Sequence, residues 1–401
     1  MANKGLLKTR FPFYFSLDPM GIKISDKIHQ LYENDKGIFR AGEIRSELVK
    51  LFREYSELRK MQHAWVDNIM GPVFAAIDIT YRCNLQCPYC FVSAGKRKNA
   101  PTISKQNFIR IVDLLADSGT LGICLCGGEP TLHPDLLEFI SYAKDYDMTV
   151  NMVTNGTLIN KKFANRLAKA DIDLVQVSID GSRAEIMDRL RGRGTYNRAI
   201  LALQNLVNNG IITGIAFSAT KINISDFPNV AKMCAEMGVN RIRSMFLVPE
   251  NEEHLKLIPS DEDYKKLVRW IQENQARYQS WIEFGDPTEH IVLGEFIGHI
   301  MISINPEGYI LPSPYIALAY GNILKDDWHA LWNELQCVWS SNPVFNTILN
   351  HLRDEKDFLK MNRLSLNRNE NEEILNVKEL SSKEQRVLAN QIKEVLNYED
   401  S

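Results

Sequence analysis

The chain has 401 residues, of which 45% are hydrophobic and 24% charged, and its formal net charge is −3. This length provides for two or three domains, and the composition is that of an ordinary globular protein. The near balance of charge disfavours a dedicated nucleic-acid-binding protein, and no apolar run is long enough to span a membrane. Because Phe11–Leu17 lacks the cleavage site of a signal peptide, we expect a cytoplasmic protein without a membrane or nucleic-acid partner.

A β-rich apolar run followed by an amphipathic helical stretch recurs between about Pro72 and Val248. The expected strands are Val73–Thr80, Gly122–Cys126, Met148–Thr154, Leu174–Ile179, Ile212–Ala219 and Arg241–Val248. The expected helices are Ser104–Ser118, Pro134–Tyr146, Lys161–Ala170, Tyr196–Asn209 and Phe227–Met237. This alternation predicts a parallel sheet with right-handed crossovers, either an open doubly wound sheet or part of a (β/α) barrel.

The strongest motif is a group of three cysteines, Cys83, Cys87 and Cys90, directly after the first expected strand. Their C-x3-C-x2-C spacing, in a cytoplasmic chain with seven cysteines, favours metal ligands over a disulfide framework. A structural zinc site needs four protein ligands, so a distant histidine such as His63 or His133 would have to complete it. Three thiolates instead suit a four-iron cluster with one iron left open for chemistry.

With this motif the chain resembles the radical S-adenosylmethionine (SAM) superfamily over about residues 72–250. In that family the three cysteines bind a [4Fe–4S] cluster whose open iron chelates SAM, and the fold is a partial (β/α)6 barrel. Reductive cleavage of SAM gives methionine and a 5′-deoxyadenosyl radical, which abstracts a substrate hydrogen. The resemblance implies one cluster, SAM as the second cofactor, and an electron donor such as flavodoxin or ferredoxin. It also implies an α/β fold, a TIM-like partial barrel.

Two further motifs match the family after the second and third strands. Gly127-Gly128-Glu129-Pro130 matches the GGEP motif, which in the family holds the amino group of SAM. Glycines allow the backbone to approach a ligand closely, and Glu129 offers a carboxylate to an ammonium group. Asn155, in Thr154-Asn155-Gly156, either reaches SAM or serves only as a turn-forming residue.

Later positions match family residues around the rest of SAM. Ser178 and Asp180, in Ser178-Ile179-Asp180-Gly181, lie two apart on one face toward the ribose or the SAM carboxylate. Arg191 matches an arginine that pairs with that carboxylate, the alternative being a surface salt bridge. The remaining matches are Tyr89 beside the adenine, and Asn223 and Leu247 near the ribose and adenine.

The region after the barrel resembles a SPASM/twitch extension, with a β-hairpin expected from Ile300–Asn305 and Tyr309–Leu311. Such extensions normally bind auxiliary clusters through several cysteines. Here Ser313 stands at the usual cysteine and Cys337 is the last cysteine of the chain, so we expect a cluster-free α+β cap. The loss favours redox-neutral chemistry such as epimerisation, with a thiol returning a hydrogen atom. The candidate thiols are Cys337, Cys126 and Cys124, each of which could instead only pack.

The pattern divides the chain into a helix-rich region (1–71), a barrel (72–282), a SPASM/twitch-like extension (283–340) and a charged helical tail (341–401). The first region, with an amphipathic segment at Glu43–Lys60 and a short edge strand expected at Phe13–Ser16, either recognises a leader peptide or caps the barrel. In the tail, Ser382–Leu396 is a helix that either packs or frays.

The resemblance favours a radical SAM enzyme that modifies a ribosomally made peptide. One alternative is the same chemistry on a small molecule such as an aminosugar or a nucleoside. An alternative of another class is a non-catalytic iron–sulfur or zinc protein. The order of the cysteine motif, GGEP, SIDG and Arg191 along successive units disfavours this last alternative.

Overall fold

The structure is a computed structural model. It describes residues 71–97, 100–274, 277–285, 287, 291, 301–352, 355–366 and 374–397. The expected strand Phe13–Ser16, the segment Glu43–Lys60 and His63 lie outside the described residues. Among the described residues, no helix has both the length and the apolar character needed to cross a membrane.

One sheet of nine strands organises the described chain, in the order β7-β6-β5-β4-β3-β2-β1-β8-β9. The strands are β1 (Phe74–Thr80), β2 (Gly122–Gly127), β3 (Thr149–Thr154), β4 (Leu174–Ser178), β5 (Ile212–Ser218), β6 (Arg241–Met245), β7 (Trp281–Gly285), β8 (Met301–Ile304) and β9 (Ile310–Leu311). Neighbours are parallel except for the antiparallel β8–β9 pair. Strands β1 to β7 follow one another in sequence order, which is the winding of a (β/α) barrel, whereas a doubly wound sheet reverses direction. The predicted TIM-like partial barrel is confirmed.

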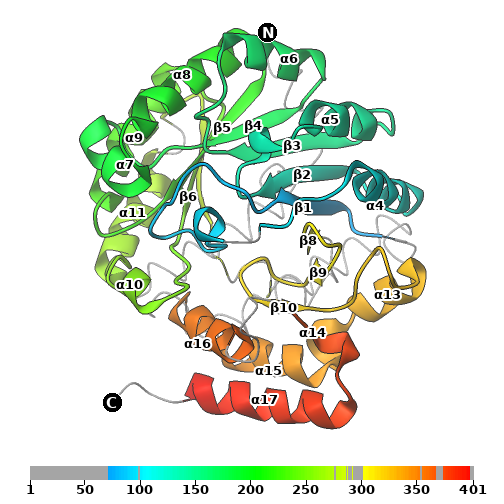
Figure 1. The fold of residues 1–401 in the computed structure, drawn as a ribbon. Coiled ribbons are helices and arrows are strands. Elements are labelled where there is room, and N and C mark those ends of the chain that lie inside the picture. The colour runs from blue at the N-terminus through cyan, green and yellow to red at the C-terminus, as the bar shows by residue number, and fades with distance from the viewer. Residues whose placement is uncertain are drawn as a thin grey trace, which may run out of the picture.

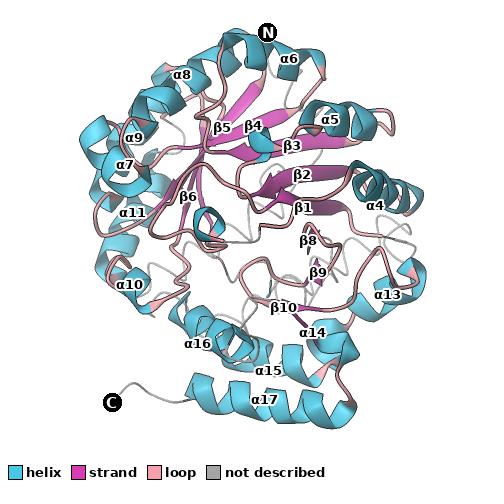
Figure 2. Cartoon of the chain, in the orientation of Figure 1, coloured by secondary structure: helices cyan, strands magenta, loops and turns pink. Residues whose placement is uncertain are grey.

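Helices connect the strands and lie around the outside of the fan that the strands form (Figures 1 and 2). They are α4 (Lys105–Asp117), α5 (Leu136–Lys144), α6 (Lys161–Lys169), α7 (Ala184–Arg191), α8 (Thr195–Asn208), α9 (Phe227–Glu236), α10 (Glu252–Leu255) and α11 (Asp261–Asn274). Side chains cap α4, α6 and α10, because Ser104 Oγ accepts from Asn107 N (3.1 Å), Asn160 Oδ1 from Phe163 N (2.9 Å) and Asn251 Oδ1 from His254 N (3.1 Å). The sequence did not predict α7, α10, α11 or β7; α7, α10 and β7 are too short for their periodicity to be distinctive.

The two faces of the barrel strands differ in burial. Outward residues such as Ile77, Leu125 and Val177 are fully buried beneath the helices. Inward residues such as Ala76 and Gln176 remain partly exposed. The helices therefore form the hydrophobic core against the outer face of the sheet, and the inner face stays accessible.

The C-terminal part forms a second hydrophobic core. The expected hairpin is present as β8 and β9, and β8 also pairs in parallel with β1 of the barrel. The further elements are β10 (Leu318–Ala319), α13 (Trp328–Leu335), α14 (Val338–Ser341), α15 (Pro343–His351), α16 (Glu355–Leu366), β11 (Leu375–Asn376) and α17 (Ser382–Asn397). Helix α17 packs rather than frays, because Leu388, Ile392 and Leu396 are buried in this core.

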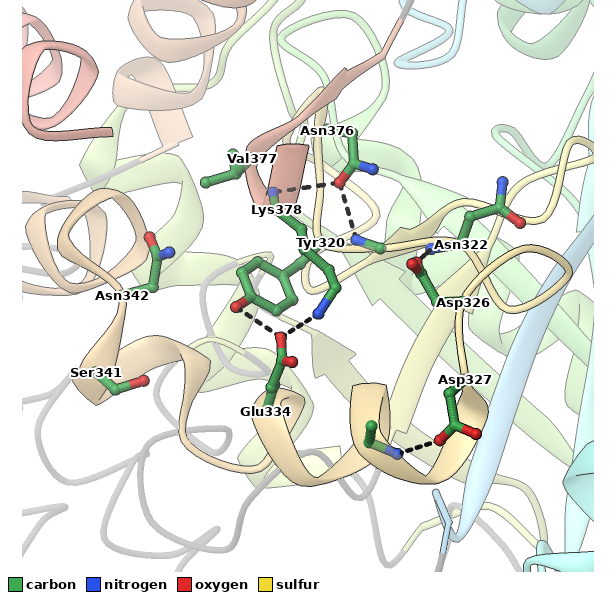
Figure 3. A network of polar contacts seen from close by, with 12 residues as sticks. Tyr320, Asn322, Asp326, Asp327, Glu334, Ser341, Asn342, Asn376, Val377 and Lys378 are labelled. Atoms are coloured by element: carbon green, nitrogen blue, oxygen red, sulfur yellow. Dashed lines mark hydrogen bonds and ion pairs between the residues drawn. The ribbon is translucent and has the colours of Figure 1, made fainter. Parts of the chain in front are cut away.

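A polar network joins residues Asn376 and Lys378 of the C-terminal tail to the extension (Figure 3). Glu334 on α13 accepts from Tyr320 Oη (3.0 Å) and from Lys378 Nζ. Asn376 Oδ1 accepts from the backbone N–H of Gly321 (2.9 Å) and of Lys378 (3.3 Å). These contacts join α13, the turn after β10 and the segment after β11.

Candidate active site

The three cysteines lie in the loop that leaves the carboxyl end of β1, and this loop runs across the middle of the view in Figure 1. Cys83, Cys87 and Cys90 are free thiols and each is partly exposed. Their loop is ordered locally, since Cys90 N donates to Cys87 O (3.2 Å) and Leu85 N donates to Cys83 Sγ (3.5 Å). The carboxyl ends of the strands are where active sites of β/α barrels are found.

The thiols influence one another electrostatically. Burial raises the pKa of Cys83 to about 11, and Glu129 and the two neighbouring cysteines add to the rise. Burial also raises the pKa of Cys87, against the opposing charge of Arg191, with Cys90 and Asp180 adding to the rise. The three sulfurs therefore share one region, and a group that binds them as thiolates must displace their protons.

The donor set fits a cluster better than a single ion. Among the described residues, no three His, Cys, Asp or Glu side chains are grouped so that they could hold one metal ion. His133 is wrong as a zinc ligand, because Nε2 bonds to Ile103 O (3.0 Å) and Nδ1 accepts from Asp135 N (3.1 Å). A four-iron cluster binds each thiolate at a different iron, so its ligands surround a body and not a point.

Gly127 and Gly128 bring the turn after β2 against the cysteine loop. A Cβ on Gly127 would lie 2.2 Å from Thr80 O, and one on Gly128 would lie 2.3 Å from Arg82 O. Gly128 N donates to Thr80 O (2.7 Å), and Glu129 N donates to Arg82 O (2.8 Å). The glycines thus allow close approach to the protein's own backbone, a requirement that the sequence did not reveal. The turn and the loop form one unit.

Glu129 is fully buried and links the ends of β2 and β3. Its Oε1 accepts from Thr131 N (3.1 Å) and Thr154 Oγ1 (2.6 Å), and its Oε2 accepts from Asn155 N (2.7 Å). Burial raises the pKa of Glu129, although these hydrogen bonds act in the opposite direction. Pro130 follows at the start of a short 3₁₀ turn, Pro130–Leu132.

Asn155 extends the same unit to the cysteines. Its Nδ2 donates to Asn84 Oδ1 (2.8 Å) and lies 4.0 Å from Cys83 Sγ. Its Oδ1 accepts from Thr157 N (2.9 Å), which is the bond of a turn-forming asparagine. The side chain therefore both shapes the turn and contacts the cysteine loop.

Asp180, Arg191 and Tyr89 form a buried charged group. Asp180 is fully buried, and its Oδ2 accepts from Tyr89 Oη and from Arg191 Nε. Its Oδ1 accepts from Ser218 N (2.7 Å). The alternative of a surface salt bridge is wrong, since the Arg191 side chain is only 10% exposed. Although burial opposes the charge of Arg191, the Asp180 carboxylate raises its pKa. Tyr89 lies between two cysteines in sequence, so this group joins the cysteine loop to β4.

The other predicted residues lie at the ends of β4 to β6. Ser178 is partly exposed on the inner face, and Leu247 is buried after β6. Asn223 is fully buried, with Nδ2 donating to Asp180 O (3.1 Å) and Ser218 O (3.0 Å). The amide of Asn223 therefore ties β4 to β5. The structure gathers all the predicted residues at one edge of the barrel, and their contacts with SAM stay predictions.

Two features near this edge were not predicted. Asp78, on the inner face of β1, is an acidic residue inside an apolar strand, which was the signal that could have identified it. Burial raises its pKa to about 6, against a hydrogen bond to Tyr81 and the charge of Arg97. Phe91, just after Cys90, contacts Tyr315 of the extension with ring centroids 5.1 Å apart. The C-terminal part thus touches the cysteine loop.

Known proteins resemble the chain in both sequence and fold. Residues 77–234 match the family model of the radical SAM superfamily. The chain is 30% identical over 292 residues to mycofactocin maturase MftC from Mycolicibacterium smegmatis, covering 69% of this chain and 72% of that protein. It is 31% identical over 239 residues to Fe-coproporphyrin III synthase from Methanosarcina barkeri, covering 57% and 59%. The structure of Streptococcus suis SuiB bound to S-adenosylmethionine shares the fold with a TM-score of 0.58 and 17% identity, covering 91% and 87%.

The chain belongs to the radical SAM superfamily. It is therefore an enzyme of the class that uses a [4Fe–4S] cluster and SAM, as its cysteine motif predicted.

Proposed function

We propose that the chain is a radical SAM enzyme that modifies a ribosomally made peptide. Cys83, Cys87 and Cys90 would hold one [4Fe–4S] cluster at the carboxyl edge of the barrel. When bound, this cofactor supplies an electron for cleavage of SAM to a 5′-deoxyadenosyl radical, which abstracts a substrate hydrogen. A flavodoxin or ferredoxin would deliver that electron.

The chain's own residues bind and orient SAM. The Gly127–Pro130 turn would hold its amino group, and Arg191 would pair with its carboxylate, while Asp180 keeps the guanidinium in place. Ser178 and Leu247 would line the ribose and adenine positions, with Tyr89 beside the ring, and Asn155 would reach SAM from the end of β3, while the buried Asn223 would hold the strand ends in place. Glu129 and Asn223 support this arrangement because their hydrogen bonds connect neighbouring strand ends. Rigid strand ends hold a reactive group at a fixed place against one C–H bond.

The proposal of a peptide substrate rests on the 30% identity to MftC, a mycofactocin maturase, over most of both chains. In fold, the chain is also similar to SuiB, which has been crystallised with its precursor peptide SuiA. Residues 1–71 would recognise the leader of the peptide, and residues 283–340 would act as a SPASM/twitch-like cap without a cluster.

A second candidate substrate is a small molecule. The observation in its favour is the 31% identity to Fe-coproporphyrin III synthase, whose name refers to a porphyrin and not a peptide. The class of reaction would be the same, and only the group held above the barrel would differ.

The test starts from protein purified and reconstituted without oxygen, with SAM and a reduced flavodoxin. We expect about four iron atoms per chain and the formation of 5′-deoxyadenosine. Short open reading frames next to the gene are then translated and offered as substrates, and their masses and hydrolysates are compared before and after reaction. A modified residue supports the proposal. If the enzyme forms 5′-deoxyadenosine and converts a porphyrin but none of the peptides, the second candidate replaces the peptide proposal.

A further inference from the structure

The inner face of the barrel is unusual in composition. The interior of a TIM barrel is normally filled with bulky branched residues. Here seven inward positions of the first four strands carry small or polar side chains, namely Ala76, Asp78, Cys124, Cys126, Asn151, Gln176 and Ser178, alongside the apolar Phe74, Val153 and Leu174. Of these seven, all but Asn151 are partly exposed. This surface lies directly below the edge at which the cysteine loop is placed, so a substrate can reach it.

Two thiols lie together on this surface. Cys124 and Cys126 are two residues apart on β2 and point to the same face. Their sulfur atoms are 3.3 Å apart, and Cys126 directly precedes the Gly127–Pro130 turn. Two residues along a strand rise by roughly 6.5 Å, which is at the upper end of the Cα separations that a disulfide spans. A small adjustment of the strand would let the pair oxidise.

Neighbouring groups indicate that the pair faces a ligand. In the register of the sheet, Cys124 lies beside Asn151 and Cys126 lies beside Asp78. Asn151 is 5% exposed, and its Oδ1 has no hydrogen-bond partner among the described residues. Native proteins rarely leave such an atom unpaired, because its desolvation costs free energy. An amide oxygen left free beside a thiol pair points to a donor group on a bound molecule.

We propose that Cys124 and Cys126 form a dithiol that returns a hydrogen atom to the substrate radical. This role rests on the proposed function and explains how one chain without auxiliary clusters completes a redox-neutral change such as epimerisation. The S–H bond is close in strength to the Cα–H bond of a peptide, so a thiol can pass a hydrogen atom to an α-carbon radical without a large energy cost. The hydrogen bond that Cys126 Sγ donates to Cys124 Sγ, together with burial, raises the pKa of Cys126 well above its ordinary value, which keeps its thiol protonated.

The step balances with both thiols. The S–H bond of Cys126 breaks, the hydrogen atom forms the new C–H bond, and a thiyl radical remains. Cys124 loses its proton to solvent water, and its sulfur bonds to the thiyl sulfur. The resulting disulfide radical anion passes one electron to an oxidised flavin or iron–sulfur carrier, which leaves a disulfide. A dithiol reductant then restores the two thiols before the next turnover.

The other free cysteines outside the cluster motif do not meet these conditions. Cys234 is fully buried on α9 within the outer core. Cys337 is exposed, and its sulfur contacts Glu334 O (3.5 Å) and Ser341 Oγ (3.4 Å) in its own turn. Cys337→Ser is therefore the matched control for serine substitutions in the dithiol.

The experiment needs no identified substrate. The iron-loaded enzyme is incubated in D₂O with SAM and a partly reduced flavodoxin, so that thiol hydrogens exchange and the radical formed from SAM can take deuterium from sulfur. We expect deuterium in 5′-deoxyadenosine and a Cys124–Cys126 disulfide in the mass spectrum of the protein. C126S should lose both signals, C124S should lose the disulfide, and C337S should match the wild type.

A second readout is independent of turnover. Phenylarsine oxide bridges two adjacent thiols, so the iron-loaded wild type and C337S should bind one equivalent that both C124S and C126S lose. Equal iron content in all variants shows that each has folded. Unlabelled 5′-deoxyadenosine from the wild type, or equal labelling in C126S, would overturn the dithiol and leave the proposed function standing. Absence of 5′-deoxyadenosine from the wild type would overturn both.

Discussion

The mouth of the barrel and the C-terminal part both contain polar networks, but they differ in burial. At the mouth, Asp180 is fully buried and bonded to Arg191 and Tyr89. In the C-terminal part, the Glu334 and Lys378 side chains that pair are 44% and 25% exposed. A buried charge must keep its partner, whereas an exposed pair contributes little. We infer that the buried pair at the barrel mouth holds site residues in fixed positions, whereas the exposed pair only helps to attach the C-terminal tail to the rest of the C-terminal part.

The two regions also differ in what occupies their cysteine positions. The barrel loop presents three partly exposed thiols. At the corresponding place in the extension, Ser313 is buried and its Oγ accepts from Tyr315 N (3.2 Å). The Ser313 hydroxyl thus shapes its own turn at the position where the resemblance to a SPASM/twitch extension predicts a cysteine. The comparison therefore predicts that cofactor chemistry depends on the barrel, and that the C-terminal core affects mainly stability.

Replacing Cys83, Cys87 and Cys90 together by alanine has the largest expected effect. The triple variant should bind no cluster and should form no 5′-deoxyadenosine, because thiolates are its protein ligands. Iron analysis and chromatography of the products measure both. Ser313→Cys is the control and should leave iron content and cleavage unchanged. Retained 5′-deoxyadenosine in the triple variant would refute the assignment of the motif.

Asp180→Ala should lower the free energy of unfolding by about 3–5 kcal/mol, because it leaves the buried guanidinium of Arg191 without its carboxylate. Urea-induced unfolding measures the loss. The control is Glu138→Gln, which removes the exposed partner of Lys105 and should produce no measurable change. Equal stability of the two variants would show that the buried group does not hold the mouth together.

Ile392→Ala should cost about 2–5 kcal/mol, because Ile392 is buried in the C-terminal core where α17 packs. Thermal unfolding measures the loss of stability. Below the unfolding transition, iron content and 5′-deoxyadenosine formation per iron should equal those of the wild type. A loss of iron at that temperature would show that cluster binding depends on the C-terminal core. The contact between Phe91 and Tyr315 would then be the structural link between the two.

Lys378→Met should have the smallest effect, below about 1 kcal/mol, because the ion pair with Glu334 is partly exposed. The melting temperature at low and high salt measures it, and the small difference should shrink as salt screens the pair. Lys360→Met, at a pair with the buried Asp357, provides the contrasting variant and should cost more. A larger loss in Lys378→Met would mean that the network of Figure 3 is a main support of the cap.

The sequence alone was sufficient for six strands and five helices of the barrel. All six expected strands are present, as are the five expected helices, with ends that differ by at most two residues except that β6 ends at Met245, three residues before the expected Val248. Apolar periodicity and glycine signals are local, so they can be read without knowing the fold. The cysteine motif and the motifs after β2 and β4 identified the family for the same reason, since each is a short contiguous segment.

Other features were decided only by the tertiary structure. The sequence left open whether the strands form a doubly wound sheet or a barrel, and the pairing order settled this. It left open a surface salt bridge for Arg191, and the burial of the Arg191–Asp180 pair excludes that alternative. The surroundings of Gly127 and Gly128 are likewise set by the loop after β1.

The physical reason is the range of the interactions. Strand and helix formation depends on residues a few positions apart, so sequence periodicity carries it. The free energy of a buried charge, and the contact of Cys126 with Asp78 on the next strand, depend on groups brought together from distant parts of the chain. The sequence by itself therefore determined the barrel units and the family motifs, and the folded sheet decided which side chains face one another inside it.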